Sequence, residues 1–149
     1  MNAAVQYGQM NEKNAIHSYC EKTGEKVMEC GLFVHLDCGY LAASPDGLTD
    51  SGGIIKVKCP KAAEHLTIQE SIKTIKGFCL DKLHVTGKEW CDFIVWTDND
   101  IYVERIFPDY DFWRQTLLPK LTFFFEKVLL PEIVDPRKCT SMDIREPDN

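Results

Sequence analysis

Two short segments near the middle of the chain carry the residue types of a phosphodiester-cleaving site. The first is residues 41–48 (LAASPDGL), which contains Asp46, and the second is residues 56–60 (KVKCP), which contains Lys58. Carboxylates hold Mg²⁺ or Mn²⁺, because these ions prefer oxygen ligands. Such a metal lowers the pKa of a bound water and neutralises phosphate charge, while a lysine stabilises the negative charge that develops. The pattern therefore indicates metal-assisted cleavage of a phosphodiester bond.

One position departs from that chemistry. The site needs an acid two residues before the lysine, on the same strand face, and this chain has Lys56 there. A unit charge and a divalent ion about 4 Å apart interact by roughly 8 kcal/mol at an effective dielectric constant near 20. Because an ammonium group replaces a carboxylate, this attraction becomes a repulsion. Lys56 is therefore expected to oppose metal binding.

The first element that must position these residues is a helix over residues 3–22, which Thr23-Gly24 ends. Its inward stripe carries Glu12 among apolar residues at spacings of three and four. A carboxylate on such a stripe must be paired, hydrogen-bonded or bound to a cation, since burying a bare charge is costly. The alternative is that Glu12 lies at the edge of the stripe and reaches solvent, and this helix alone favours that alternative.

The following segments predict a sheet and further helices. Short β-like runs cover residues 26–28, 32–36 and 40–43, and a clearer strand covers residues 54–59 before Pro60. Alternation places Lys56 and Lys58 on one face of that strand. A helix over 61–75, a hairpin of strands 89–96 and 101–106, and a helix capped by Asp109 or Asp111 complete the order. Pro119 should kink or divide this last helix. The result is a mixed α/β (α+β) fold with one sheet flanked by helices.

Length and composition favour a single domain. The chain has 149 residues, of which 44% are hydrophobic, and we expect a domain over 1–134 followed by a polar tail over 135–149. The sequence contains no apolar run long enough to span a membrane, and its N-terminus lacks the pattern of a secretory signal. Seven cysteines without a C-x-x-C pair predict reduced thiols inside the cell, in the nucleus or cytoplasm. A zinc site of Cys30, His35 and Cys38 is an alternative to ordinary core cysteines, which the spacing favours.

Charge is unevenly distributed along the chain. The net charge is −6, which argues against nonspecific nucleic-acid binding by the whole surface. Residues 56–88 nevertheless hold seven lysines against three acids, a local excess of +4. This segment could hold a phosphate backbone, or it could be the solvated face of a lysine-rich helix.

Taken together, the motifs resemble the YqaJ-type viral recombinase family, the group of phage lambda exonuclease within the PD-(D/E)XK nuclease fold. The resemblance spans roughly residues 5–135 and is carried by the following segments: GxxxE at 8–12, GLFV at 31–34, LAASPDGL at 41–48, GIIKVKCP at 53–60, LHVTGKEWCDF at 83–93, ERI at 104–106, Phe112-Trp113 and LPE at 130–132. The order and spacing of these segments are specific, whereas Pro-Asp alone would be weak.

The resemblance implies a restriction-endonuclease-like core and an Mg²⁺- or Mn²⁺-dependent exonuclease that acts on the ends of linear duplex DNA. It implies that Asp46 binds the metal, that Val57 offers its backbone carbonyl to it, and that Glu12 supports the site from the first helix. Lys58 is then the catalytic lysine. The oligomeric state stays open, although ring-shaped assemblies occur in similar proteins.

Two departures from the family pattern predict impaired catalysis. The family has Glu where this chain has Lys56, and it has a Tyr- and Gln-rich helix, Y-x-x-Q-x-Q-x-x-L, where this chain runs from Phe78 directly into Leu83-His84. That helix is therefore expected to be missing, and Gln69 is a poor substitute for its glutamine.

Three hypotheses follow. The chain is an active nuclease in which Glu64 or Glu70 supplies the missing acid, a domain that binds DNA without cutting it, or a decayed mobile-element copy. A binding module unrelated to nucleases is a further alternative, in which residues 44–47 form a simple turn.

Overall fold

The computed structural model describes residues 3–60, 79–137 and 142–143. The helix predicted over 61–75 and the candidate acids Glu64 and Glu70 lie outside these residues. The chain divides into two compact units, Met1–Pro108 and Asp109–Asn149. The prediction of one domain over 1–134 with a polar tail over 135–149 stays a prediction.

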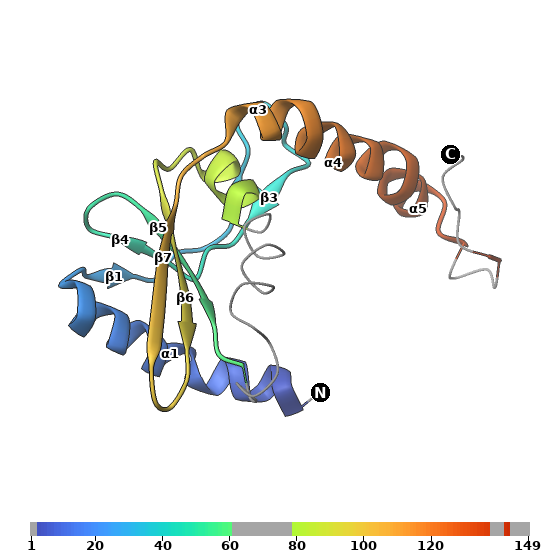
Figure 1. Ribbon diagram of the computed structural model, residues 1–149. Coiled ribbons are helices and arrows are strands. Elements are labelled where there is room, and N and C mark those ends of the chain that lie inside the picture. The colour runs from blue at the N-terminus through green and yellow to red at the C-terminus, as the bar shows by residue number, and fades with distance from the viewer. Residues whose placement is uncertain (1–2, 61–78, 138–141, 144–149) are drawn as a thin grey trace. The chain divides into compact units, whose positions relative to one another are not determined.

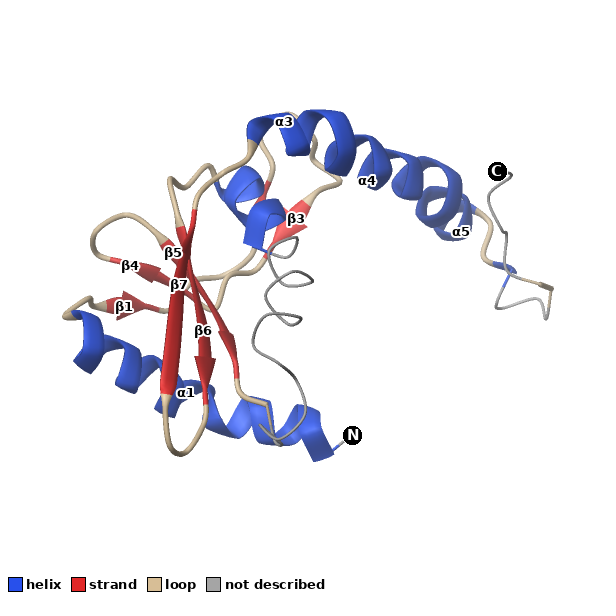
Figure 2. Cartoon of the chain, viewed as in Figure 1, coloured by secondary structure: helices blue, strands red, loops and turns tan. Residues whose placement is uncertain are grey.

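The first unit is built around a five-stranded mixed sheet (Figures 1 and 2). It contains the helix α1 (Ala3–Thr23) and the strands β1 (Val27–Met28), β4 (Gly47–Thr49), β5 (Ile54–Lys58), β6 (Cys91–Trp96) and β7 (Ile101–Ile106). The strand order is β1-β4-β5-β6-β7, with β5 and β6 parallel and every other neighbouring pair antiparallel. Strands β2 (Phe33–Val34) and β3 (Ala42–Ala43) form a separate antiparallel pair. The predicted fold class, a central mixed sheet flanked by helices, is confirmed.

The two faces of β5 contribute to two different hydrophobic clusters. On one face Ile55, Val57 and Cys59 pack with Ala15 and Tyr19 of α1. On the other face Ile54 packs with residues of the helix over 79–86 and of β6, namely Cys79, Leu83, Cys91 and Phe93. The alternation predicted from the sequence therefore holds, and Lys56 and Lys58 belong to the face that carries Ile54.

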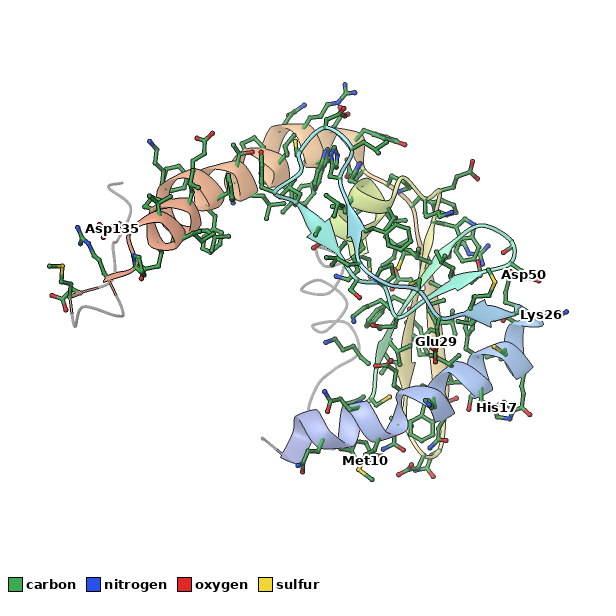
Figure 3. All side chains as sticks on the ribbon, turned by 180° about the vertical axis from the view of Figure 1, so that it is seen from behind. Met10, His17, Lys26, Glu29, Asp50 and Asp135 are labelled. Carbon is green, nitrogen blue, oxygen red and sulfur yellow. The ribbon has the colours of Figure 1, made fainter. Side chains whose placement is uncertain are left out.

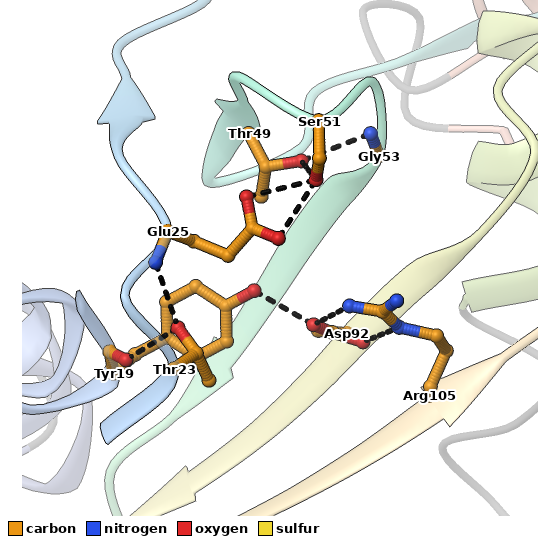
Figure 4. A network of polar contacts seen from close by, with 8 residues as sticks. All are labelled: Tyr19, Thr23, Glu25, Thr49, Ser51, Gly53, Asp92 and Arg105. Carbon is orange, nitrogen blue, oxygen red and sulfur yellow. Dashed lines mark hydrogen bonds and ion pairs between the residues drawn. The ribbon is translucent and has the colours of Figure 1, made fainter. Parts of the chain in front are cut away.

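A buried carboxylate ties α1 to the hairpin of β6 and β7 (Figure 4). Asp92 is 2% exposed and accepts hydrogen bonds from Tyr19 Oη at 2.7 Å and from Arg105 Nε and Nη2 at 2.8 and 2.9 Å. The guanidinium group of Arg105 also lies 3.6 Å from the ring centroid of Trp90. Burial and the bond to Asp92 raise the pKa of the Tyr19 hydroxyl. These contacts fix the position of α1 on the sheet.

The second unit contains one helical run from Tyr110 to Val134. It comprises α3 (Tyr110–Phe112), a π-helical turn (Trp113–Leu117), α4 (Leu118–Phe124), a second π-helical turn (Phe125–Leu129) and α5 (Leu130–Val134). Asp109 caps its start, since its side chain accepts a hydrogen bond from the Phe112 amide at 2.9 Å. Pro119 does not end the run. A π-helical turn precedes it, and another precedes Pro131, which is how the chain accommodates residues without an N–H group.

The strands before Asp46 are shorter than the sequence predicted, and β4 was not predicted at all. Its first residue follows Pro45-Asp46, a pair that is typical of a turn. Gly47 is required here because a Cβ at this position would clash with Cγ1 of Val27. No described helix is long and apolar enough to cross a membrane.

Candidate active site

The Asp46 carboxylate lies beside β5, just before the first residue of β4. The Asp46 amide donates to the Ile55 carbonyl at 3.1 Å, and the next residue, Gly47, pairs with Ile55 in the sheet. After Ile55, β5 no longer pairs with β4, and the Asp46 side chain is the hydrogen-bond partner of its backbone instead. Its Oδ2 accepts a hydrogen bond from the Val57 amide at 2.6 Å. The backbone of β5 therefore fixes where this carboxylate points.

Lys56 contacts the other oxygen of the same carboxylate. Its Nζ donates to Asp46 Oδ1 at 2.7 Å. The side chains of Lys56 and Asp46 are 21% and 11% exposed, so this ion pair is largely shielded from water. Both oxygens of Asp46 thus have a positively charged or N–H partner within the protein.

Glu12 reaches the same place from α1. Burial raises the pKa of its carboxyl, the charge of Asp46 raises it further, and the charge of Lys56 lowers it. Burial also raises the pKa of the Cys59 thiol to about 11, with the charges of Glu12 and Asp46 adding to the effect. Glu12 is half-buried, which favours the alternative of a paired carboxyl over that of a carboxyl that merely reaches solvent at the edge of its stripe.

The opposite side of α1 faces outward, as Met10 and His17 show (Figure 3). Met10 is 78% exposed and the His17 side chain is 75% exposed. The helix thus presents Glu12 toward the sheet and these residues away from it.

Lys58 and Val57 end β5. Lys58 is exposed and shares a strand face with Lys56, while the Val57 side chain is buried against α1. The structure thus brings Glu12, Asp46 and Lys56 together. Lys58 lies two residues further along β5, on the same face as Lys56. The roles of these residues, and of the Val57 carbonyl as a metal ligand, stay predictions.

The helix over residues 79–86 contains Leu83-His84 and adds two charged residues. The prediction that the family's Tyr- and Gln-rich helix is missing stays a prediction, since residues 61–78 lie outside the described part of the chain. In the helix over 79–86, burial raises the pKa of the Asp81 carboxyl, and the charges of Lys82 and then of Lys56 offset part of this increase. Lys82 Nζ lies 3.7 Å from Asp81 Oδ1. Sequence reasoning missed both Asp81 and Lys82. The end of their helix carried a signal, because Thr86-Gly87 resembles the helix end at Thr23-Gly24 and Gly87 has a φ of 65°.

The donor set around Asp46 does not fit a divalent cation. Both Asp46 oxygens already accept from donors, and a metal ligand set would require the ammonium group of Lys56 to leave. Within residues 3–60, 79–137 and 142–143, no group of three His, Cys, Asp or Glu residues is arranged to hold a metal. In the loop of the alternative zinc site, His35 Nδ1 accepts from the amides of Asp37 and Cys38, both at 3.1 Å.

Comparison with known proteins identifies the class. The model of the YqaJ-like viral recombinase domain family matches residues 1–89, and the chain belongs to this family. An alkaline exonuclease (LHK-Exo) from Laribacter hongkongensis is similar in structure, with a TM-score of 0.76 and 30% identity over 96% of this chain and 77% of that one. The same exonuclease in complex with dAMP gives a TM-score of 0.73 and 28% identity over 95% and 77%. No curated protein matches the sequence.

Proposed function

We propose that this chain is a DNA exonuclease-type domain of the viral recombinase class whose metal-dependent cleavage is impaired. The observation that carries the proposal is the 2.7 Å contact between Lys56 Nζ and Asp46 Oδ1. Membership of the family and similarity to an alkaline exonuclease support DNA as the substrate. The complex of that relative with dAMP supports a deoxynucleotide as a ligand of this chain.

In this proposal the residues keep the roles that the resemblance implies. Once the Lys56 ammonium group is displaced, Asp46, Glu12 and the Val57 carbonyl would hold Mg²⁺ or Mn²⁺, and Lys58 would stabilise the charge on the phosphate. Lys56 lowers the affinity for the metal, because its ammonium group repels the ion and competes for Asp46. The ends of linear duplex DNA are the proposed substrate, and an intracellular location is part of the proposal.

The test is nucleotide release from linear duplex DNA in the presence of Mg²⁺. We expect Lys56→Glu to release nucleotides at least about a hundredfold faster than the wild type, since each 1.36 kcal/mol of restored transition-state stabilisation is worth about tenfold. The double variant Lys56→Glu, Asp46→Ala should be inactive and serves as the control. Equal rates for the wild type and Lys56→Glu would contradict the proposal that Lys56 is the cause of the impairment.

A second candidate function is DNA binding without cleavage. The observation that favours it is the placement of Lys56 and Lys58 on one face of β5, where both ammonium groups could contact phosphates. The nucleotide-release assay separates the two candidates when it is paired with a binding measurement. Binding without nucleotide release in both proteins would favour the second candidate, and a decayed copy without activity would show neither.

A further inference from the structure

The described part of the candidate site is formally neutral, which is unusual for a site that must attract a divalent cation. Among residues 3–60 and 79–137, its charged side chains are the carboxylates of Glu12, Asp46 and Asp81 and the ammonium groups of Lys56, Lys58 and Lys82. Three negative charges therefore face three positive ones. A glutamate at position 56 would leave four carboxylates against two lysines, a charge of −2, which one divalent ion would balance. Lys56 in place of glutamate therefore changes the formal charge of the site from −2 to zero.

The ammonium group of Lys56 already makes the contact that a metal would make with Asp46. It lies 2.7 Å from Asp46 Oδ1, and the pair is partly desolvated. The Val57 amide holds Asp46 Oδ2 at 2.6 Å, so the carboxylate is fixed for this contact. An ammonium group has three N–H donors, and the contact with Asp46 uses one of them. The 21% exposure of the Lys56 side chain leaves it within reach of a ligand that enters the site.

We propose that Lys56 replaces the divalent cation, so that this site binds a phosphate group of DNA without a metal. The inference rests on the proposed function, in that DNA is the ligand of the site. Lys56 neutralises Asp46 and retains N–H donors for a phosphate oxygen, and Lys58 adds a positive charge on the same strand face. Phosphate contacts of this kind position DNA without reading its sequence. A lysine does not activate a water as a bound metal does, so binding of this kind does not lead to cleavage.

The experiment measures the affinity of the full chain for a 5′-phosphorylated linear duplex oligonucleotide, in EDTA and in Mg²⁺ at matched ionic strength. The wild type should bind equally well in both, within about twofold, because its site needs no metal to offset the phosphate charge. Lys56→Glu should bind roughly tenfold more weakly in EDTA and recover affinity in Mg²⁺. Mg²⁺ is thus expected to strengthen DNA binding by Lys56→Glu and to leave DNA binding by the wild type unchanged.

Two further variants protect this test from a folding defect in Lys56→Glu. Lys56→Met should weaken binding in EDTA and reduce the slope of log affinity against log salt by about one, whereas Lys56→Arg should preserve both. Lys127→Met removes an exposed lysine from the second unit and is the matched control, with no comparable loss expected. A specific contribution of Lys56 predicts this order, while a general loss of positive charge predicts equal losses for Lys56→Met and Lys127→Met and would overturn the inference.

The outcomes separate this inference from the proposed function. Wild-type binding that disappears in EDTA would overturn the inference and leave the proposed exonuclease-type function standing. Failure of the wild type to bind DNA in either condition would overturn both. Metal-independent binding together with no gain of cleavage in Lys56→Glu would support the inference and count against the proposed cause of impairment.

Discussion

Mg²⁺ is expected to stabilise the Lys56→Glu variant against thermal unfolding and to leave the wild type almost unchanged. In the variant, the introduced carboxylate would face that of Asp46 where the Lys56–Asp46 contact of 2.7 Å now lies, and two facing carboxylates bind a cation strongly. Mg²⁺ at 100 times its Kd adds roughly 2.7 kcal/mol to the stability of the folded state. For a chain of this length each kcal/mol raises Tm by about 2–4 °C. Melting curves with and without Mg²⁺ measure the difference directly.

Two controls make this result specific. The variant Lys127→Glu has the same change of charge at an exposed position of the second unit, and Mg²⁺ should not stabilise it. Adding Asp46→Asn to Lys56→Glu removes one of the two facing carboxylates and should abolish most of the Mg²⁺ effect. A Tm of the wild type that rises with Mg²⁺ as much as that of Lys56→Glu would show that Lys56 does not oppose the metal.

Arg105→Met is expected to cost about 3–5 kcal/mol of unfolding free energy, because it leaves the buried Asp92 carboxylate without its charged partner. Arg105 supplies two hydrogen bonds to Asp92, which is 2% exposed, and among the described residues the Tyr19 hydroxyl would be the hydrogen-bond donor that remains. The stacking of Arg105 on Trp90 would be lost as well. Denaturant unfolding monitored by tryptophan fluorescence gives the free energy of unfolding.

Arg114→Met is the matched control for this prediction. Arg114 is exposed, and a surface substitution of this kind changes stability by no more than about 0.5 kcal/mol. Tyr19→Phe should fall between the two, at about 1–3 kcal/mol, since it removes one hydrogen bond to a buried charged group. Equal unfolding free energies for Arg105→Met and Arg114→Met would contradict the view that the Asp92 network holds α1 on the sheet.

Local patterns in the sequence were sufficient for much of the fold. Alternation along β5 correctly assigned Ile55 and Val57 to one face and Lys56 to the other. A cap by Asp109 or Asp111 also followed from residue type, and the structure shows that Asp109 fills this role. The strand β4 could not be predicted, because it is only three residues long and pairing with β1 and β5, rather than local preference, makes it a strand. Asp92 is another case, since its partners Tyr19 and Arg105 are distant in sequence.

The candidate site was predictable in its members and less so in their contacts. The motif places Asp46 and Lys56 ten residues apart. The hydrogen bond from the Val57 amide to the Asp46 carboxylate could not be predicted, because it depends on β4 starting at Gly47, directly after Asp46. Glu12 was placed on the correct stripe of α1, whereas its interaction with Asp46 depends on how α1 packs on the sheet. Asp81 was missed because no local pattern reveals that the helix over 79–86 brings its carboxyl near Lys56.

The central claim is that the Lys56 ammonium group, and not a divalent ion, holds Asp46. A crystal structure of the wild-type chain grown with Mn²⁺ and examined by anomalous scattering tests this claim most directly. We predict no manganese peak at Asp46 and an Nζ–Oδ1 distance close to the 2.7 Å described here, with Lys56→Glu crystals showing a peak at the same place. A manganese ion bound to Asp46 in the wild type, with Lys56 turned away from it, would contradict the account.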